Sequence, residues 1–553
     1  ALDTALIFSL TLSSKISDEI HVMRKIVVDG SNTSGFQRTA VVALGGALEY
    51  ESGKFKVPVQ SVSVEEDAAR AIKVPSSIER SFDLEEEQEQ RVYALDRLGT
   101  PLVEVALAPI EGGTPDQVTK TASSLGRLMR STGRVARGLG TIRQDLNVSV
   151  MNGSVIEVKG VQRLEQIAKV VEYEAARQKF FFDLAKLVKS KIGNELEIDS
   201  FDVTELFRNT GSRILKNAFA KIKQPKVAAV TLKSFSGLIG MENEFHSRLG
   251  KELGAIARTY GIGGVFHSDE LPDYGITKEE VESVKKQIGM LEPDAFVLVA
   301  GEPSKVTRTV EALIERMRYV TKGVPAETRA ATEDGETTFL RPRPGAARMY
   351  PETDIPLIKV SNSRLEKLKA EIPEPWERVV EKFSGRYDLP TQLAEPLLDS
   401  DRKNVFVETV ASTKLPARYV ASVLLDVLQS LSREGVEVGL ITDGALKNIF
   451  ASLDAGKFAK EAIPELIRLI GKDPDSSLEQ ALSKAGLGSI SKEQLKKIVI
   501  DTIQENVSLV KEKGESSEST IMGKVMQKVR GKVDGKLVNE TVKEILTAFL
   551  EKR

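Results

Sequence analysis

The stretch Arg143-Gln144-Asp145-Leu146-Asn147-Val148 places an acid and an amide on an apolar strand, and Ile156-Glu157-Val158-Lys159 places a further acid and a lysine on another. A carboxylate in apolar surroundings is costly unless it is paired with a cation or bound to a metal ion. These two strands therefore mark the first candidate for a chemical site.

Two earlier strands carry acids in the same way. The segment Val64-Glu65-Glu66-Asp67 closes an apolar strand that starts at Val59, and Glu104 lies inside Pro101-Leu102-Val103-Glu104-Val105. Carboxylate oxygens suit Mg²⁺, which carries and polarises phosphate groups. The alternative is that each acid faces solvent or pairs with a neighbouring lysine or arginine, as most acids in proteins do.

The order of strand and helix patterns indicates a multidomain α+β protein. Residues 1–200 mix both patterns, and the regular elements that we expect there are strands at 23–28, 41–48 and 59–64 and helices at 115–130 and 164–186. Residues 201–324 read as a separate α+β unit, with a helix at 242–260 that carries His246, strands at 263–267 and 295–300, and a helix whose apolar face includes Val306, Val310, Leu313 and Met317. From about residue 363 the chain reads as helical.

Composition limits the class of protein. The chain has 553 residues, of which 41% are hydrophobic and 29% charged, enough for roughly three to four globular domains. The absence of cysteine excludes disulfides and thiolate chemistry and fits a cytoplasmic protein, and three histidines make a histidine-rich metal centre improbable. The net charge of −2 excludes a wholly basic nucleic-acid coat.

Neither a membrane span nor a P-loop is predicted. No run of eighteen apolar residues occurs, and no G-x-x-x-x-G-K-[ST] motif is present. The chain begins with Ala1, and the short apolar segment 5–12 lacks a basic leader. We expect it to be a buried segment of a chain cut upstream rather than a signal peptide.

Two basic clusters could bind phosphate. One extends from Asp116 to Asp145 without an intervening acid and contains Lys120, Arg127, Arg130, Arg134, Arg137 and Arg143. The other, within 523–536, contains Lys524, Lys528, Arg530, Lys532 and Lys536 against one acid, Asp534. Each could equally be a solvated basic face, and for the second cluster a solubilising stripe is the simpler interpretation.

Taken together, the motifs resemble the GatB/GatE family, the kinase-type subunits of tRNA-dependent amidotransferases. The segments that carry the resemblance are 29–39 (DGSNTSGFQRT), 65–70 (EEDAAR), 98–104 (LGTPLVE), 142–149 (IRQDLNVS) and 157–160 (EVKG). The string 341–354 (RPRPGAARMYPETD) looks like the archaeal branch of the family.

The resemblance implies four domains. A cradle-type mixed α/β domain would comprise 1–200 plus 325–362, and 201–324 is similar to the insertion domain of bacterial-type aspartyl-tRNA synthetases. An all-α helical domain would comprise 363–436, and 437–553 resembles a YqeY-like tail domain.

The resemblance also implies a reaction. ATP would phosphorylate the γ-carboxylate of glutamate attached to tRNA(Gln), with Mg²⁺ as cofactor, and ammonia would then displace the phosphate to give Gln-tRNA(Gln). The ammonia would come from a GatD-like asparaginase or amidase subunit, in a heterodimer or a heterotetramer with two of each subunit.

By position in the motifs, the resemblance assigns roles to particular residues. The metal ligands would be Glu65, Glu66 and Glu104. The catalytic set would be Glu104, Asp145, Asn147, Glu157 and Lys159. The partners of the ATP phosphates would be Arg143 and Arg341. Separately, the clustered positive charge of Lys524, Lys528, Arg530 and Lys532 leads us to expect that they contact tRNA phosphates. The family begins with a Gly-Leu-Glu-Ile-His segment that contributes ligands and that this chain lacks, so we expect an N-terminally truncated member.

Two other functions remain open. The chain could be a tRNA-binding scaffold without chemistry of its own, which would show no ATP turnover. It could also belong to aminoacyl-tRNA synthetase machinery, although it lacks the His-x-Gly-His and Lys-Met-Ser-Lys-Ser signatures of class I enzymes.

Overall fold

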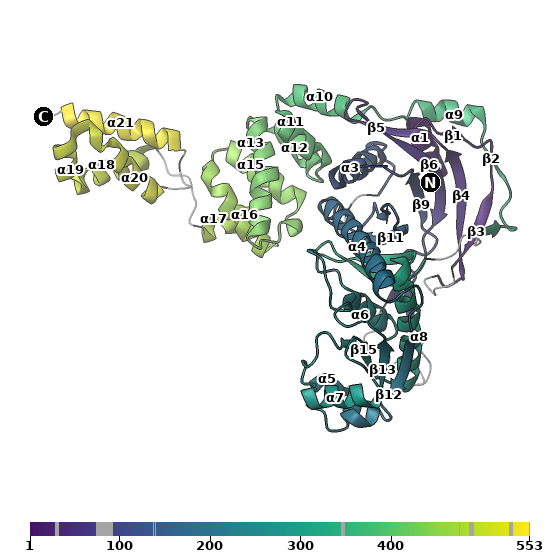
Figure 1. Ribbon diagram of the computed structural model, residues 1–553. Coiled ribbons are helices and arrows are strands. Elements are labelled where there is room, and N and C mark those ends of the chain that lie inside the picture. The colour runs from purple at the N-terminus through teal and green to yellow at the C-terminus, as the bar shows by residue number, and fades with distance from the viewer. Residues whose placement is uncertain are drawn as a thin grey trace. The chain divides into compact units, whose positions relative to one another are not determined.

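A computed structural model describes residues 1–553 except 28–31, 73–91, 137, 139, 344–348, 475, 486–491, 530–532, 534 and 552–553. The chain forms two compact units, residues 1–373 and 374–553. The first contains sheets and helices and the second contains helices, which confirms the predicted multidomain α+β class (Figure 1). Within the described residues, no helix is both long enough and apolar enough to cross a bilayer.

A seven-stranded antiparallel sheet forms the first part of residues 1–373. Its strand order is β18 (Met349–Pro351), β3 (Val22–Ile26), β4 (Phe36–Leu44), β6 (Phe55–Glu66) and β5 (Ala47–Tyr50), with β1 (Lys15–Ile16) paired to β4 and β9 (Pro101–Leu107) paired to β6. Two small pairs join β2 (Glu19–Ile20) to β19 (Ile358–Lys359) and β7 (Arg70–Ile72) to β8 (Val92–Ala94).

The core of this sheet includes α1 (Leu2–Thr11), whose residues Ala5 to Phe8 are fully buried, with Leu368 of α9 (Asn362–Lys369) packed in the same cluster. The predicted buried segment at 5–12 is therefore confirmed. The strand expected at 41–48 is split by Gly45 and Gly46, both of which have positive φ. A Cβ on Gly46 would lie 2.4 Å from the carbonyl oxygen of Leu12, so the close approach of these two segments requires glycine.

A four-stranded sheet forms the second part. Its order is β10 (Gln144–Val148), β11 (Ile156–Val161), β16 (Glu327–Ala331) and β17 (Thr337–Pro342). Alternate residues of β10 and β11, such as Leu146 and Val158, pack with Ile167 and Val170 of α4 (Leu164–Lys191). The remaining residues of each strand therefore lie on the other face. A capping box between Thr114 and Gln117 starts α3 (Pro115–Ser131), and both predicted helices are confirmed.

Residues between β11 and β16 build a third sheet. Its order is β12 (Ile198–Asp202), β13 (Lys226–Leu232), β15 (Ala295–Gly301) and β14 (Phe266–His267), and its helices are α5 (Arg213–Lys221), α6 (Leu249–Thr259), α7 (Lys278–Gln287) and α8 (Pro303–Arg318). The predicted helix face is confirmed, because Val306, Val310, Leu313 and Met317 are buried.

The helix predicted at 242–260 is wrong in its first part. It begins at Leu249, and residues 242–248 form a turn closed by a bridge between Glu242 and Arg248. The Asn243 side chain accepts hydrogen bonds from the backbone N–H groups of Phe245 and Ser247, which offers the backbone an alternative to the helix. His246 therefore lies in this turn, with φ of 54°, and not on a helix.

Residues 374–553 form two helical clusters. The first has a single core and contains α10 (Trp376–Tyr387), α11 (Thr391–Asp399), α12 (Lys403–Ser412), α13 (Ala417–Ser422), α14 (Leu428–Arg433), α15 (Asp443–Asp454), α16 (Ile463–Lys472) and α17 (Leu478–Lys484). The second has its own core and contains α18 (Lys492–Glu505), α19 (Val507–Lys513), α20 (Glu518–Val529) and α21 (Gly535–Glu551).

Candidate active site

One face of the seven-stranded sheet carries two of the predicted carboxylates. Glu104 of β9 lies opposite Ser63 of β6, and Glu65 is two residues further along β6, so Glu65 and Glu104 are diagonal neighbours on the same face. Lys25 of β3 reaches this face as well, with its Nζ 3.7 Å from Glu65 Oε1. The amide of Gln37 donates to Glu65 Oε2 at 3.2 Å.

The environment of Glu104 makes its negative charge unfavourable. The residue is exposed to solvent, but surrounding protein atoms displace part of its water and raise its pKa above the ordinary value. The charges of Glu65 and then of Asp145 raise the pKa further, while Lys25 and Lys159 oppose the shift. Two carboxylates that repel one another at a water-accessible position are an arrangement that a cation would stabilise.

Glu66 lies on the opposite face from Glu65, because neighbouring residues of a strand alternate between faces. It accepts a hydrogen bond from the backbone N–H of Arg38, whose guanidinium also donates to Glu352 at 2.8 Å. Arg24 donates to both oxygens of Glu352, at 2.7 and 2.5 Å. The three predicted metal ligands therefore do not converge on one point.

Glu352 was not among the predicted site residues, although it lies in the string 341–354. Hydrogen bonds from Arg24, from the backbone N–H of Asp354 and from Arg38 lower its pKa to about 2. The side chain of Glu352 has no surface exposed to solvent. Arg24 and Arg38 pair directly across β3 and β4, so the alternation of side chains along these strands could have placed both on one face. No sequence pattern identified Glu352 as the acid that pairs with them.

The four-stranded sheet aligns the other predicted residues in two rows. Across its strands, Asn147 pairs with Glu157, Glu157 with Thr328, and Thr328 with Arg341. In the next row, Lys159 Nζ lies 2.8 Å from Asp145 Oδ2 and 3.2 Å from Glu157 Oε1. Burial disfavours the Lys159 ammonium, but Asp145 and Glu157 outweigh that effect and raise its pKa.

The two sheets approach one another near the start of β10, because Arg143 Nη2, just before that strand, lies 3.0 Å from Asp67 Oδ2, just after β6. Asp145 raises the pKa of Glu104 and Lys159 lowers it, so both side chains lie close enough to Glu104 to affect its charge. The acids at Glu104, Asp145 and Glu157 thus form one constellation with Glu65, Lys25 and Lys159. Two residues of this group were not predicted from the sequence. Lys25 showed only as a basic residue on an expected strand. Thr328 donates a hydrogen bond to Glu157 Oε2 at 2.8 Å.

Arg143, predicted to contact phosphate, is paired in this structure. Its Nη2 lies 3.0 Å from Oδ2 of Asp67, whose side chain is largely buried. Two other members of the first basic cluster also pair with distant acids, Lys120 with Glu51 and Arg134 with Glu371. Arg137 lies outside the described residues. The run thus acquires counter-charges from acids in other parts of the chain.

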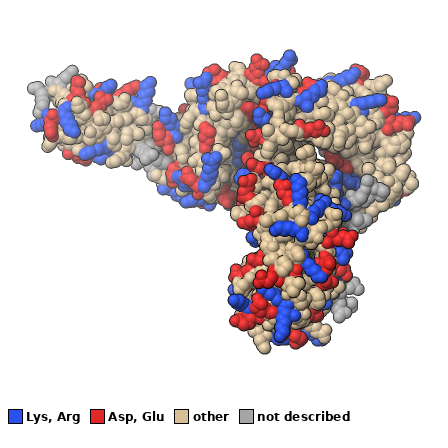
Figure 2. All heavy atoms as spheres, in the orientation of Figure 1, with Lys and Arg blue, Asp and Glu red and all other residues tan. Residues whose placement is uncertain are grey.

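Lys524 and Lys528 of the second basic cluster lie on α20, and Lys536 lies on α21. Lys524 Nζ donates to Asn506 Oδ1 at 2.5 Å, and Lys528 Nζ lies 2.7 Å from Glu505 Oε2. Arg530 and Lys532 lie outside the described residues. Figure 2 shows basic and acidic side chains interspersed over the visible face of the molecule, without one continuous basic surface.

The donor set permits a limited test for Mg²⁺. No group of three or more His, Cys, Asp or Glu side chains within the described ranges is arranged to hold a metal ion. Mg²⁺, however, usually keeps several waters and is held by one or two carboxylates together with substrate phosphates. Glu65 and Glu104 fit that mode of binding, and Glu66 does not share their face.

Two family models match the chain over most of its length. Residues 1–366 match a family model described as "GatB/GatE catalytic domain", and residues 404–546 match one described as "GatB domain". The chain belongs to the GatB/GatE family.

Archaeal proteins named as the E subunit of glutamyl-tRNA(Gln) amidotransferase are similar over nearly the whole chain. The protein of Methanocaldococcus jannaschii is 44% identical over 526 residues, which cover 95% of this chain and 81% of the relative. That of Aeropyrum pernix is 42% identical over 532 residues, covering 95% and 80%. That of Pyrococcus horikoshii is 42% identical over 524 residues, covering 94% and 79%.

Proposed function

We propose that this chain is the amidating subunit of a glutamyl-tRNA(Gln) amidotransferase, which converts Glu-tRNA(Gln) into Gln-tRNA(Gln) with ATP in the cytoplasm. The family match and the names of the relatives support the class of reaction. The observation that carries the proposal is the constellation of Glu65, Glu104, Asp145, Glu157 and Lys159 at the meeting of two sheets.

The reaction proceeds in two steps. An oxygen of the glutamate γ-carboxylate attacks the γ-phosphorus of ATP, and ADP leaves. Ammonia then attacks the activated carbonyl carbon, inorganic phosphate leaves, and the nitrogen loses a proton to form the amide. The first step is needed because a carboxylate oxygen is a poor leaving group, whereas a phosphate is a good one.

Named residues have distinct tasks in this scheme. Glu65 and Glu104 hold Mg²⁺, which when bound neutralises charge on the phosphates during transfer. The ammonium of Lys159 binds a phosphate oxygen, and Asp145 and Glu157 orient it through their contacts of 2.8 and 3.2 Å. Asn147 lies beside Glu157 in the same row and supplies an uncharged donor.

Glu66, Arg143 and Arg341 have secondary tasks. Arg143 and Arg341 bind ATP phosphates, and Arg143 must exchange Asp67 for phosphate to do so. Glu66 supports β4 through Arg38 rather than by binding the metal directly.

The proposal includes a partner and a division into domains. A GatD-like asparaginase or amidase subunit supplies ammonia, in a heterodimer or a heterotetramer with two of each subunit. Residues 1–200 and 325–362 form the cradle that performs the chemistry, and 201–324 form the inserted domain. The sequence places the boundary between a helical domain and the tail at 436–437, but α10 to α17 share one core and α18 to α21 share another. We therefore infer that the helical domain extends through α17 and that the tail comprises α18 to α21.

Direct product analysis tests this function. The protein is incubated with Glu-tRNA(Gln), ATP, Mg²⁺ and ammonium chloride, and the amino acid released from the tRNA is identified. We expect glutamine, with ATP hydrolysis that depends on Glu-tRNA(Gln). A scaffold without chemistry, the alternative function, would bind the tRNA but hydrolyse no ATP.

We predict that the tail contacts tRNA phosphates through Lys524, Lys528, Arg530 and Lys532. Lysine on a helix provides a point charge and little base recognition, so replacing all four with alanine should weaken cognate and non-cognate tRNA about equally. The slope of log K against log salt should flatten by up to roughly three units, at ~0.7 to 0.9 per neutralised phosphate.

A matched control removes the same charge elsewhere in residues 437–553. Lys457, Lys460, Lys472 and Lys484 are exposed, and their replacement by alanine should leave the slope unchanged. An equal slope for the α20 variant and the wild type would show that the cluster is a solvated stripe. Loss of cognate binding alone would show that the tail reads tRNA sequence or shape.

A further inference from the structure

Thr328 is a buried hydroxyl directed at the candidate active site. It lies on β16, is completely buried, and pairs with Glu157 across the parallel strands β11 and β16. Its Oγ1 donates to Glu157 Oε2 at 2.8 Å. A buried hydroxyl is costly without a partner, so this hydrogen bond fixes the rotamer of Thr328 as well as the position of the carboxylate.

The two oxygens of Glu157 have different partners. Oε2 accepts from Thr328, and Oε1 lies 3.2 Å from Lys159 Nζ. Lys159 is in turn 2.8 Å from Asp145. Holding one oxygen of a carboxylate fixes the plane of the group and hence the direction of the other oxygen, so the orientation of Lys159 depends on Thr328.

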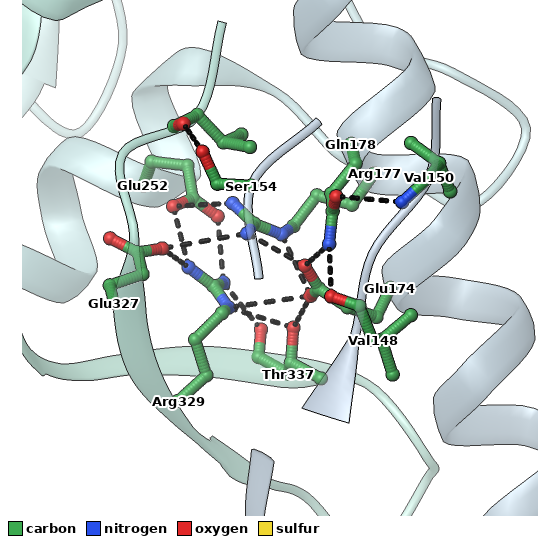
Figure 3. A network of polar contacts seen from close by, with 11 residues as sticks. Val148, Val150, Ser154, Glu174, Arg177, Gln178, Glu252, Glu327, Arg329 and Thr337 are labelled. Carbon is green, nitrogen blue, oxygen red and sulfur yellow. Dashed lines mark hydrogen bonds and ion pairs between the residues drawn. The ribbon is translucent and has the colours of Figure 1, made fainter. Parts of the chain in front are cut away.

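The position of β16, the strand that carries Thr328, is fixed by the following residue, Arg329. Arg329 lies on the opposite face and is 1% exposed. Its Nη1 and Nη2 each donate to Glu252 at 2.8 Å, and its Nε donates to Thr337 at 2.8 Å (Figure 3). Shifting β16 would break this buried network, and the cost of unpaired buried charges makes such a shift improbable.

We propose that Thr328 is a positioning residue of the amidation reaction, which acts by fixing Glu157 and through it the Lys159 ammonium. Because Thr328 is completely buried, its effect on a substrate passes through Glu157. The effect on turnover rests on the function proposed above, whereas the effect on the geometry of Glu157 does not.

The test compares Thr328→Val with Thr328→Ser. Valine keeps the β-branched shape but removes the hydroxyl, whereas serine keeps the hydroxyl and removes a methyl group. The control is Thr309→Val on α8, because Thr309 is also fully buried and its hydroxyl donates only to the carbonyl of Lys305. Each full-length variant is crystallised, and each is assayed for ATP hydrolysis that depends on Glu-tRNA(Gln).

We expect Thr328→Val to lose the contact between Glu157 Oε1 and Lys159 Nζ and to lower kcat about tenfold. The KM for tRNA should change less than about twofold, because the hydroxyl of Thr328 is completely buried and cannot contact tRNA directly. Thr328→Ser should keep the contact between Glu157 and Lys159 and most of the wild-type kcat. Thr309→Val should match the wild type in this contact and in kcat.

The crystal structures decide the proposal independently of activity. An unchanged Glu157–Lys159 contact in Thr328→Val overturns it, and so does an equal loss of kcat in Thr328→Val and Thr328→Ser. A wild-type protein that forms no Gln-tRNA(Gln) contradicts the proposed function, while the comparison of the contact in the two Thr328 variants still tests the positioning role.

Discussion

Replacing Glu104 with glutamine is expected to reduce ATP-dependent phosphorylation of Glu-tRNA(Gln) by at least about a hundredfold. Glutamine preserves the shape of the side chain but cannot balance the charge of Mg²⁺. It also removes the repulsion between Glu104 and Glu65, so the protein should remain folded. Transfer of labelled γ-phosphate from ATP measures the step directly.

A suitable control for this variant is Glu49→Gln. Glu49 is an acid of β5 in the same sheet, and its side chain is 54% exposed and pairs with Lys56. The Glu49→Gln variant should phosphorylate Glu-tRNA(Gln) as the wild type does. Glu49→Gln and Glu104→Gln should both bind tRNA with nearly unchanged affinity. Near-normal phosphorylation by Glu104→Gln would exclude Glu104 from the site.

Replacing Glu252 with glutamine is expected to destabilise residues 1–373 by about 3 to 5 kcal/mol, because it leaves three buried arginines with only two of the network's acids. Glu252 of α6 accepts from Arg329 through both oxygens and from Arg177 at 3.2 Å. The network balances three acids against three arginines, and its members are Glu174, Glu252, Glu327, Arg177, Arg316 and Arg329.

The third arginine explains why the loss should be large. Arg316 is 4% exposed, and burial lowers its pKa. None of its three side-chain nitrogens has a hydrogen-bond partner within the described residues, and its guanidinium lies 5.1 Å from the ring centroid of Phe181. Its charge is therefore balanced mainly by the acids of the network at a distance, and Glu252 is the foremost of these.

Urea unfolding followed by hydrogen exchange in α6 measures this effect. Glu242→Gln is the control, since Glu242 is an exposed acid just before the same helix and should change stability by less than about 0.5 kcal/mol. Equal stabilities of the two variants would show that the network contributes little.

The effect of Glu252 should depend on pH. Burial opposes its ionisation, but Arg329 and Arg177 outweigh burial and lower its pKa from 4.5 to about 2. Because the folded pKa lies below the unfolded one, the stabilisation is fully present above about pH 4.5 and is lost as the pH falls toward 2. The difference between wild type and Glu252→Gln should shrink over that range.

The sequence by itself determined the candidate carboxylates and the helical or strand character around them. Acids at Glu104, Asp145 and Glu157 stand out because the residues beside them are apolar, and this pattern is local. The helices at 115–130 and 164–186 were predictable because the spacing of apolar residues along a helix is also a local pattern. Local patterns failed at 242–248, where the side chain of Asn243 redirects the backbone.

Only the tertiary structure decided which of these groups meet. Strand alternation separates Glu65 from Glu66, but the register of β6 against β9 is what places Glu65 beside Glu104. The pairing of Arg143 with Asp67 and of Thr328 with Glu157 joins residues 76 and 171 positions apart. Such pairs depend on the register of non-local strands, and the spacing of residues along one strand carries no information about the strand that will pair with it.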